Sequence, residues 1–532
     1  MTVGASERAG QPEISTGTGE PPSLARSDKV SLADFAPFLL IGAVVVLLGV
    51  LAVRVASRIG LPSLLIYLAL GVILGESGFG IDFENAELTQ VLGLTALAVI
   101  LAEGGLTTRW TSARPLLGPG IMLSTVGVGV SVAITAGVVM LIFGSPLPAA
   151  LLFGAVVSST DAAAVFASLR RLGLPARITG TLELESGFND APAVLLVVAL
   201  SESMSTAESS PIPTLIALIG YELIAGAALG IGIGVAGAWL LRRSALPVSG
   251  LYPLATVSLC MTGYAAATVA HASGFLAVYV CGLVLGNSAL PHRAATLGFV
   301  EGLAWLAQIG LFVLLGLLAS PSRLVGVIVP ATLVGLALLL VARPAAVYLS
   351  VRWFKIPWRE QVFLSWAGLR GAVPIVFATI PISMAVEDAE QIFDAVFVLV
   401  VVFTIVQGTT LPTVARWLGL VTALPEREVD VESSTLEELN AELLQLTVPA
   451  ASRLHGVYVS ELRLPTDAAV TLLVRDGHSF VPDASTRLVH GDQLLVVTTL
   501  VSRDATMRRL RAVSRAGRLA RWRGEVGGRL AD

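Results

Sequence analysis

The feature that most constrains this chain is a series of long apolar stretches between residues 36 and 416, separated by short polar breaks. A helix needs about 20 apolar residues to cross the hydrocarbon core of a bilayer. Only 14% of the 532 residues are charged, whereas soluble domains carry about 25%. The pattern therefore predicts an all-α polytopic membrane protein, in which each apolar stretch is one helix.

Cutting the apolar region at charges, prolines and glycine clusters predicts thirteen spans. Basic residues gather in the loops after odd-numbered spans and acidic residues in the loops after even-numbered spans, with Arg323 as the exception. Because basic loops remain in the cytoplasm, we predict an external N-terminus and a cytoplasmic C-terminus. The approximate limits of the spans are 36–57, 61–76, 88–106, 115–143, 148–170, 177–201, 212–241, 250–270, 274–290, 298–318, 323–352, 359–385 and 392–416.

A repeat with an offset of 211 residues runs through these spans. The segment "GVILGES", from Gly71, matches "GLVLGNS", from Gly282, and the same offset carries Gly105 onto Gly316. Paired segments are seven spans apart, and because seven is odd they cross the membrane in opposite directions. Inverted repeats are typical of secondary transporters, and interruptions at matching positions indicate the binding site. The paired spans 5 and 12 are both interrupted, by "SSTDAAA" and by "GLRGAVP".

Four ionisable residues stand near the middle of predicted spans: Asp161 in span 5, Glu185 and Asp190 in span 6, and Arg370 in span 12. Each costs about 2.5–3.5 kcal/mol at the centre of an inserted helix. A structural ion pair that braces two helices explains Glu185 and Arg370 more readily than it explains the two aspartates. Ser186 lies one helical turn before Asp190. A hydroxyl, a carboxylate and nearby carbonyl oxygens form a hard-oxygen site that suits Na⁺ or K⁺.

A buried carboxylate is also a site for a proton, because burial favours the neutral form of the acid. A proton and a metal ion then compete for Asp190, and this competition is the basis of antiport. The neighbouring residue is Asn189 rather than a second aspartate. A single exchanging carboxylate predicts one proton per cation and therefore electroneutral exchange.

Four segments resemble motifs of the NhaP-type monovalent cation:proton antiporters. They are "SSTDAAAVFASL", "TLELESGFNDAPAV", "AEGGL" and "WAGLRGAVPI", and the resemblance covers about residues 36–416. It implies the NhaA-like antiporter fold, with thirteen transmembrane helices, inverted repeats and two broken helices that cross. It also implies a homodimer and elevator-type alternating access.

The resemblance assigns the ion site residue by residue. Asp190 would bind the cation and the proton alternately. Ser186 and the backbone of Thr160 would coordinate K⁺ or Na⁺, and Asp161 and Glu185 would contribute, directly or through water.

The resemblance also places Asn189 among the ion-binding residues and gives Arg370 a supporting role. Asn189 would hold the interrupted part of span 5, and Arg370 would pair with Glu185. At Ala162 the chain departs from the family, in which many members have proline at this position. The segment "STDAAAVF" is closer to the CvrA-like potassium/proton subgroup, so we favour K⁺, although the chemistry of the site leaves Na⁺ open.

After about residue 425 the composition becomes that of a soluble domain. The acidic amphipathic segment "STLEELNAELLQL" is followed by short runs typical of strands, and residues 432–505 resemble a TrkA-C (RCK-C) domain. The resemblance implies a small cytoplasmic α/β domain that dimerises, with or without a small regulatory ligand such as a cyclic dinucleotide. The other predicted segments are a disordered tail at 1–34, the exchanger domain at 35–420 and an Arg-rich tail at 506–532, which is solvated or touches membrane lipids.

The sequence argues against other classes of function. It has no nucleotide-binding P-loop and no nucleophilic triad, so we expect neither an enzyme nor an ATP-driven pump, no cofactor and no nucleic-acid partner. The two cysteines, Cys260 and Cys281, lack metal-site spacing. The prediction is a K⁺ or Na⁺/H⁺ antiporter of a bacterial plasma membrane. Two alternatives stay open: a cation channel subunit regulated by the RCK-like domain, although no filter of the TVGYG type is present, and a membrane sensor of ions or pH.

Overall fold

The computed structural model describes most of the chain. The residues that it describes are 32–59, 62–76, 78–80, 85–161, 174–206, 212–244, 246–421, 431–436, 441–450, 452–499 and 501–520. The chain divides into a unit that ends at Leu48 and a unit that begins at Gly49. The first unit contains the start of helix α1 (Leu32–Ile59), and all later elements belong to the second.

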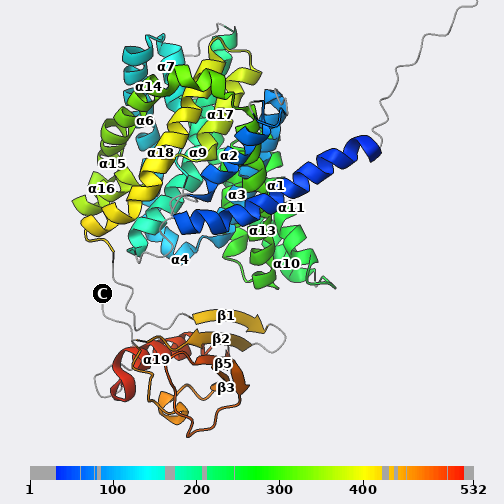
Figure 1. The fold of residues 1–532 in the computed structure, drawn as a ribbon, viewed down its shortest axis with the longest axis vertical. Coiled ribbons are helices and arrows are strands. Elements are labelled where there is room, and N and C mark those ends of the chain that lie inside the picture. Colours follow the sequence, from blue (N-terminus) through cyan, green and yellow to red (C-terminus); the bar gives the residue numbers. More distant parts are fainter. Residues whose placement is uncertain are drawn as a thin grey trace, which may run out of the picture. The chain divides into compact units, whose positions relative to one another are not determined.

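Each of the thirteen predicted spans contains helix in the structure (Figure 1). Spans 2 to 6 contain α2 (Ser63–Leu74); α3 (Ala86–Thr107); a run of α4 (Trp110–Ala113), η1 (Arg114–Leu116), α5 (Leu117–Met122), η2 (Leu123–Gly127) and α6 (Val128–Phe143); α7 (Leu147–Val156); and α9 (Ala176–Thr206). Spans 7 to 13 contain α10 (Ile212–Arg243); α11 (Leu251–Val269); α12 (Gly274–Gly286); α13 (Arg293–Leu318); a run of α14 (Pro321–Ala337), η3 (Leu338–Ala342), α15 (Arg343–Val351) and η4 (Arg352–Phe354); α16 (Trp358–Trp366) with α17 (Ala372–Ser383); and α18 (Ala389–Trp417).

The helices present apolar side chains on their outer surfaces. Among the described residues, eight helical segments are long and apolar enough to cross a membrane by length and composition. Leu141 is 87% exposed, Ile224 73% and Val325 71%. Large contiguous apolar surfaces are rare on soluble monomers and mark contact with a partner or a membrane. The predicted helical membrane protein is therefore supported, while the number of crossings stays a prediction.

Two helix crossings are related by the offset of 211 residues. Helix α2 crosses α13 with Gly71 against Gly316, and α12 crosses α3 with Gly282 against Gly105. The offset carries α2 onto α12 and α3 onto α13, so one crossing maps onto the other. Close approach of two helix backbones through small residues is a common packing mode in membranes. The repeat seen in the sequence thus has a structural counterpart.

The correspondence between the crossings extends to single atoms. A methyl group on Gly316 would collide with the carbonyl oxygen of Leu68, and one on Gly105 would collide with the carbonyl oxygen of Tyr279. Residues 68 and 279 are again 211 positions apart. The obstacle is backbone in both crossings, and backbone cannot move aside as a side chain can. Glycine is therefore required at these positions by space rather than by backbone conformation.

We expect Gly71→Ala to lower the free energy of unfolding by about 1–3 kcal/mol, because the new methyl group overpacks the crossing. Gly298→Ala is the matched control: it lies on α13, it is exposed, and an added methyl group there meets nothing within 4 Å. Alanine favours helix over glycine, so the control should be neutral or slightly stabilising. Thermal unfolding in detergent measures both variants, and equal stability of the two would contradict this account of the crossing.

The interruptions predicted in spans 5 and 12 are present in the described residues. Helix α7 begins at Leu147 and α16 begins at Trp358, 211 residues later. Helix α7 ends at Val156, and 159–161 are not helical; α16 ends at Trp366, and 368–371 are not helical before α17 begins. The rest of predicted span 5, including Ala162, lies outside the described residues.

The chain after residue 430 forms a small antiparallel sheet with one helix. Its strands are β1 (Val431–Leu436), β2 (Ala441–Thr447), β3 (Ala468–Arg475), β4 (His478–Phe480) and β5 (Gln493–Thr499), in the order β1-β2-β5-β3-β4. Helix α19 (Arg503–Ala516) follows, and its Leu510 and Val513 are buried in the same core as Leu494 and Val496 of β5. Part of the predicted Arg-rich tail, residues 506–516, therefore lies in this helix, because its apolar positions recur at helical spacing and pack on the sheet.

Candidate functional site

The two interrupted spans meet at their breaks. The backbone N–H of Asp161, after α7, donates to the carbonyl oxygen of Leu369 at 2.8 Å. In return the Nε of Arg370 donates to the carbonyl oxygen of Val157 at 3.0 Å. Breaking a helix frees backbone groups that need partners wherever water is absent. Each break therefore supplies partners for the other.

Charged side chains at the breaks face helix ends of opposite sign. The carboxylate of Asp161 lies against Gly371, immediately before the first residue of α17. Arg370 donates to the carbonyl oxygens of Val157 and Gly368, near the C-terminal ends of α7 and α16. The N-terminus of a helix carries a partial positive charge and the C-terminus a partial negative one. Asp161 and Arg370 thus offset the helix ends that the breaks create.

Asp190 lies opposite these breaks on α9. Its side chain is only 2% exposed, and its Oδ1 accepts a hydrogen bond from the hydroxyl of Ser159. The Nδ2 of Asn189 donates to Oγ1 of Thr160 at 2.7 Å. The hydrogen bond that the resemblance implies between Asn189 and span 5 is therefore present. The Oδ1 of Asn189 is buried and has no hydrogen-bond partner among the described residues.

Glu185 is paired with an arginine that the sequence analysis did not single out. The guanidinium of Arg343, at the start of α15, contacts both carboxylate oxygens of Glu185, with Nη2 at 2.8 Å from Oε2. Arg343 is 3% exposed and Glu185 1%. The expected pairing of Glu185 with Arg370 was wrong, because Arg370 is engaged by the carbonyl oxygens at the two breaks and Arg343 occupies the position beside Glu185.

The turn that places Arg343 is irregular. A π-helical turn, η3 (Leu338–Ala342), directly precedes Arg343, and a second π turn, η2 (Leu123–Gly127), lies in the paired span 4. In η2, Ser124 donates to the backbone carbonyl oxygen of Glu185 at 3.1 Å. Single π turns inside α-helices occur often at functional sites. Both members of this span pair therefore contact Glu185, one from a residue within its π turn and the other from the residue directly after its π turn.

Among the described residues that meet at the breaks and on the facing part of α9, carboxylates outnumber cations by one. Asp161, Glu185 and Asp190 are the carboxylates, and Arg343 and Arg370 are the cations. Glu185 is neutralised by Arg343, whereas the partner of Asp190 that the structure gives is a neutral hydroxyl, from Ser159. A buried charge without a counter-ion is costly. One monovalent cation or one proton at Asp190 removes this imbalance.

The structure brings together most of the predicted site residues. Thr160, Asp161, Glu185, Asn189, Asp190 and Arg370 all lie at the breaks or on the facing part of α9. Ser186, one turn before Asp190, is partly exposed. Sequence reasoning missed Ser159 and Arg343. The sequence did contain a signal for Arg343, because it is a charge in the middle of the apolar run "LALLLVARPAAVYL". Inserting it into a membrane carries the same free-energy cost as inserting the four ionisable residues named in the sequence analysis.

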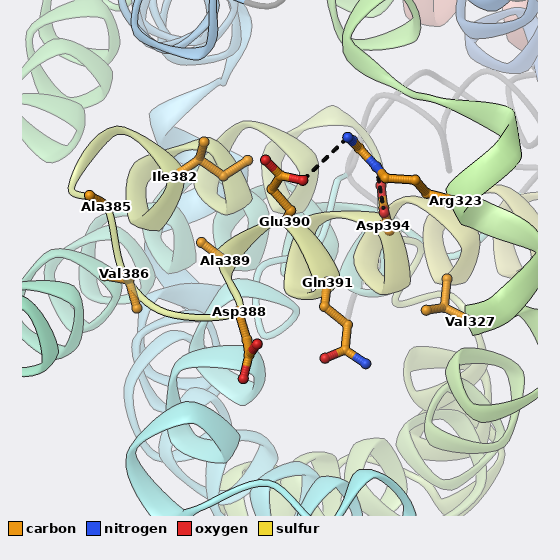
Figure 2. A pocket seen from close by; sticks show the side chains of 10 residues that line it. All are labelled: Arg323, Val327, Ile382, Ala385, Val386, Asp388, Ala389, Glu390, Gln391 and Asp394. Carbon is orange, nitrogen blue, oxygen red and sulfur yellow. Dashed lines mark hydrogen bonds and ion pairs between the residues drawn. The ribbon is translucent and has the colours of Figure 1, made fainter.

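A cavity of about 620 Å³ lies at the end of α17 that is remote from Asp161. Arg323, from the first turn of α14, pairs there with Asp394 at 3.1 Å and with Glu390 at 3.3 Å, as Figure 2 shows. Asp388 and Gln391 complete its polar lining. These ion pairs join α14 to α18. They explain why Arg323 follows an even-numbered span, where the loops otherwise carry acidic residues.

Comparison with known proteins identifies the family. The model of the sodium/hydrogen exchanger family, transmembrane part, matches residues 43–417, which contain every site residue described above. This chain belongs to the sodium/hydrogen exchanger family. A TrkA-C domain model matches residues 443–511 of the exchanger, which include β5 and most of α19.

Two relatives match more than four fifths of this exchanger. The K(+)/H(+) antiporter NhaP of Alkalimonas amylolytica is 37% identical over 446 residues, 82% of this chain and 77% of the relative. The K(+)/H(+) antiporter NhaP2 of Shewanella baltica is 36% identical over 469 residues, 86% of this chain and 80% of the relative. A solved structure of the sodium proton antiporter MjNhaP1 from Methanocaldococcus jannaschii at pH 8 has a TM-score of 0.64, covering 72% of the exchanger and 99% of that chain at 21% identity. That likeness concerns the fold alone.

Proposed function

We propose that this exchanger is a secondary antiporter that moves a monovalent cation, with K⁺ favoured over Na⁺, against H⁺ in a one-to-one, electroneutral cycle. The observation that carries the proposal is the charge balance of the buried site. Among the described residues, three carboxylates face two guanidinium groups; Arg343 pairs with Glu185, and Asp190 accepts a hydrogen bond from the neutral hydroxyl of Ser159. A single positive charge, from a cation or from a proton, balances the site in either state.

The cycle follows from competition for one carboxylate. With Asp190 ionised, a cation binds to its carboxylate together with oxygen atoms from Ser186 and the Thr160 backbone, and Asp161 and Glu185 set the negative potential of the site. When a proton reaches Asp190, the carboxyl group becomes neutral, and the cation loses its main counter-charge and leaves. Asn189 holds Thr160 in place through its amide. Because the site is neutral in both loaded states, either state can cross the membrane at low electrostatic cost.

Alternating access completes the cycle. We propose that the helices of the two breaks move together with α9 in an elevator-type motion against the glycine crossings of α2, α3, α12 and α13, in a fold with thirteen spans, inverted repeats and crossing broken helices. The proposed assembly is a homodimer in a bacterial plasma membrane, with an external N-terminus and a cytoplasmic C-terminus. The TrkA-C domain regulates exchange by dimerisation or by a small ligand such as a cyclic dinucleotide.

The preference for K⁺ rests on the relatives. The antiporters from Alkalimonas amylolytica and Shewanella baltica both have K(+)/H(+) in their names, and each covers more than four fifths of this chain. The oxygen ligands of the site suit both ions. Potassium is therefore the proposed cargo, and selectivity is a matter for direct measurement.

Purified full-length protein in liposomes with an enclosed pH dye tests the function. After a pH gradient is set, K⁺, Na⁺ or Li⁺ is added in turn. We expect K⁺ to collapse the gradient fastest and the rate to be unchanged when the membrane potential is clamped at zero. A response to none of the three cations would exclude monovalent antiport. A cation current that leaves the gradient intact would instead favour a channel.

A further inference from the structure

Tyr279 of α12 reaches across to the ion-site helix α9. Its backbone is fixed at the glycine crossing, where its carbonyl oxygen lies against Gly105 of α3. Its side chain, 2% exposed, packs with one edge of the ring on Gly187 of α9. The ring of Phe188 packs against it edge-on, with ring centroids 5.3 Å apart and an interplanar angle of 73°.

The contact with Gly187 leaves no room for another side chain. A methyl group on Gly187 would lie 2.5 Å from Cζ of Tyr279 and 3.0 Å from Cδ2. The ring therefore occupies the space where α9 would otherwise carry a side chain. Helix α9 has ordinary helical geometry here, so the glycine serves this close approach and not a special backbone conformation.

The covered position lies between an exposed acid and the buried acid of the site. Residues 183, 187 and 190 are spaced four and three apart, which places them on one stripe of α9. Along this stripe Glu183 is exposed, Gly187 is covered by the tyrosine ring, and Asp190 is buried. A cation or proton that moves along the stripe from Glu183 to Asp190 meets the ring of Tyr279.

A long hydrogen bond joins the polar end of the ring to Thr108, the residue that follows α3. The hydroxyl of Tyr279 is 3.3 Å from Oγ1 of Thr108, whereas O–H···O hydrogen bonds usually measure about 2.7–2.8 Å. The hydroxyl of Thr108 donates to the carbonyl oxygen of Gly104 at 2.7 Å. In the hydrogen bond between Thr108 and Tyr279, the tyrosine hydroxyl is therefore the donor. This hydrogen bond and the packing on Gly187 and Phe188 define the position of the ring over α9.

We propose that the side chain of Tyr279 is the gate of the ion path between Glu183 and Asp190. The ring closes the path where it lies on Gly187, and the path opens when α9 shifts relative to α12 or the ring turns away. Tyr279 is a positioning residue that binds neither cation nor proton. This inference rests on the proposed antiport through Asp190, since a gate has a purpose only if ions travel along this stripe.

Cysteine labelling tests the gate without requiring transport. Both native cysteines are first replaced by alanine, which removes every other thiol of the chain. Asp190→Cys then reports on access behind the ring, and Glu183→Cys reports on access in front of it. A charged, membrane-impermeant methanethiosulfonate is applied to everted and to right-side-out vesicles, and the side on which Glu183→Cys reacts defines the relevant face.

We expect Tyr279→Ala to raise the labelling rate of Asp190→Cys about tenfold or more, a change that corresponds to about 1.4 kcal/mol in the barrier. Tyr279→Phe keeps the ring and should label at the rate of the parent. The labelling rate of Glu183→Cys should be the same with Tyr, Phe or Ala at position 279. A general loosening of the fold would instead change the labelling rate at both cysteine positions. Tyr279→Leu serves as a second truncation if the alanine variant does not fold.

The gate is refuted if the labelling rate of Asp190→Cys does not change with truncation at position 279 in folded protein. It is also refuted if Tyr279→Phe labels as fast as Tyr279→Ala, since the hydroxyl and not the ring would then control access. Failure of the antiport proposal has a different signature, because it appears in the liposome assay with the unmodified protein and leaves the labelling rates untouched.

Discussion

Asp190→Asn is expected to abolish cation-dependent proton movement while the protein stays folded. Asparagine keeps the shape of the side chain but binds no proton in the relevant pH range and offers a cation no negative charge. Loss of the counter-charge of a buried ion costs about 3–5 kcal/mol, which corresponds to a loss of at least about 100-fold in affinity. The measured quantity is the rate at which added K⁺ collapses a preset pH gradient in liposomes.

Stability separates loss of the site from loss of the fold in this variant. Asp190 is buried, and its partner in the described residues is a neutral hydroxyl, so the amide removes an uncompensated charge. We expect Asp190→Asn to unfold at the same temperature as the parent or a higher one. Glu390→Gln is the control, because Glu390 is an acid at the remote cavity with a side chain 67% exposed. It should exchange at the parental rate, and exchange by Asp190→Asn at that rate would show that the site has been misassigned.

The second large effect is expected at the ion pair of Glu185 and Arg343. Both side chains are almost fully buried, at 1% and 3% exposure. Removing one partner leaves the other as an isolated buried charge, at a cost of about 3–5 kcal/mol. We therefore expect Glu185→Gln and Arg343→Met each to unfold at a much lower temperature than the parent. Combining the two substitutions removes both charges and should restore most of the loss.

The ion pair between Arg177 and Glu360 provides a matched comparison. It has similar geometry, at 2.6 Å, but the side chain of Arg177 is 43% exposed. Glu360 itself is buried, so it is the partner to replace: Glu360→Gln leaves Arg177 as a cation that water can reach, and it should lower the free energy of unfolding by only about 0–1 kcal/mol. A double-mutant cycle measures the coupling energy in both pairs. Equal coupling in the two pairs would contradict the view that burial makes the Glu185–Arg343 pair indispensable.

Much of the architecture could be predicted from the sequence because the lipid environment restricts the alternatives. An apolar run of about 20 residues has few ways to satisfy its backbone in a membrane other than a helix. The placement of the helices within the predicted spans and the interruptions in predicted spans 5 and 12 followed from this restriction together with the placement of polar residues. The glycine repeat could be recognised because close contact between two helix backbones tolerates only glycine. The sequence therefore has glycine at both matching positions, Gly71 and Gly282.

The pairing of charges could not be predicted in the same way. Two arginines, Arg343 and Arg370, compete for Glu185, and the sequence does not say which helix face each one occupies. The π turn before Arg343 inserts an extra residue into the helical repeat, so a regular helical projection misplaces it. Arg370 lies within the non-helical break between α16 and α17, where helical spacing has no meaning. Ser159 was hidden for the same reason, since its direction depends on the irregular backbone after α7.

The glycine crossings also constrain how the protein is made. Gly71 packs on Gly316, which follows it by about 245 residues. At a synthesis rate of about 5–20 residues per second, the second glycine leaves the ribosome about 12–50 s after the first. During that interval α2 is in the membrane before α13 has been synthesised, so its glycine face lacks the helix on which it packs in the folded protein. During biogenesis this face must be covered, either by the insertion machinery or by temporary pairing with another helix. A nascent chain halted before residue 316 should therefore be a preferred target for quality-control proteolysis.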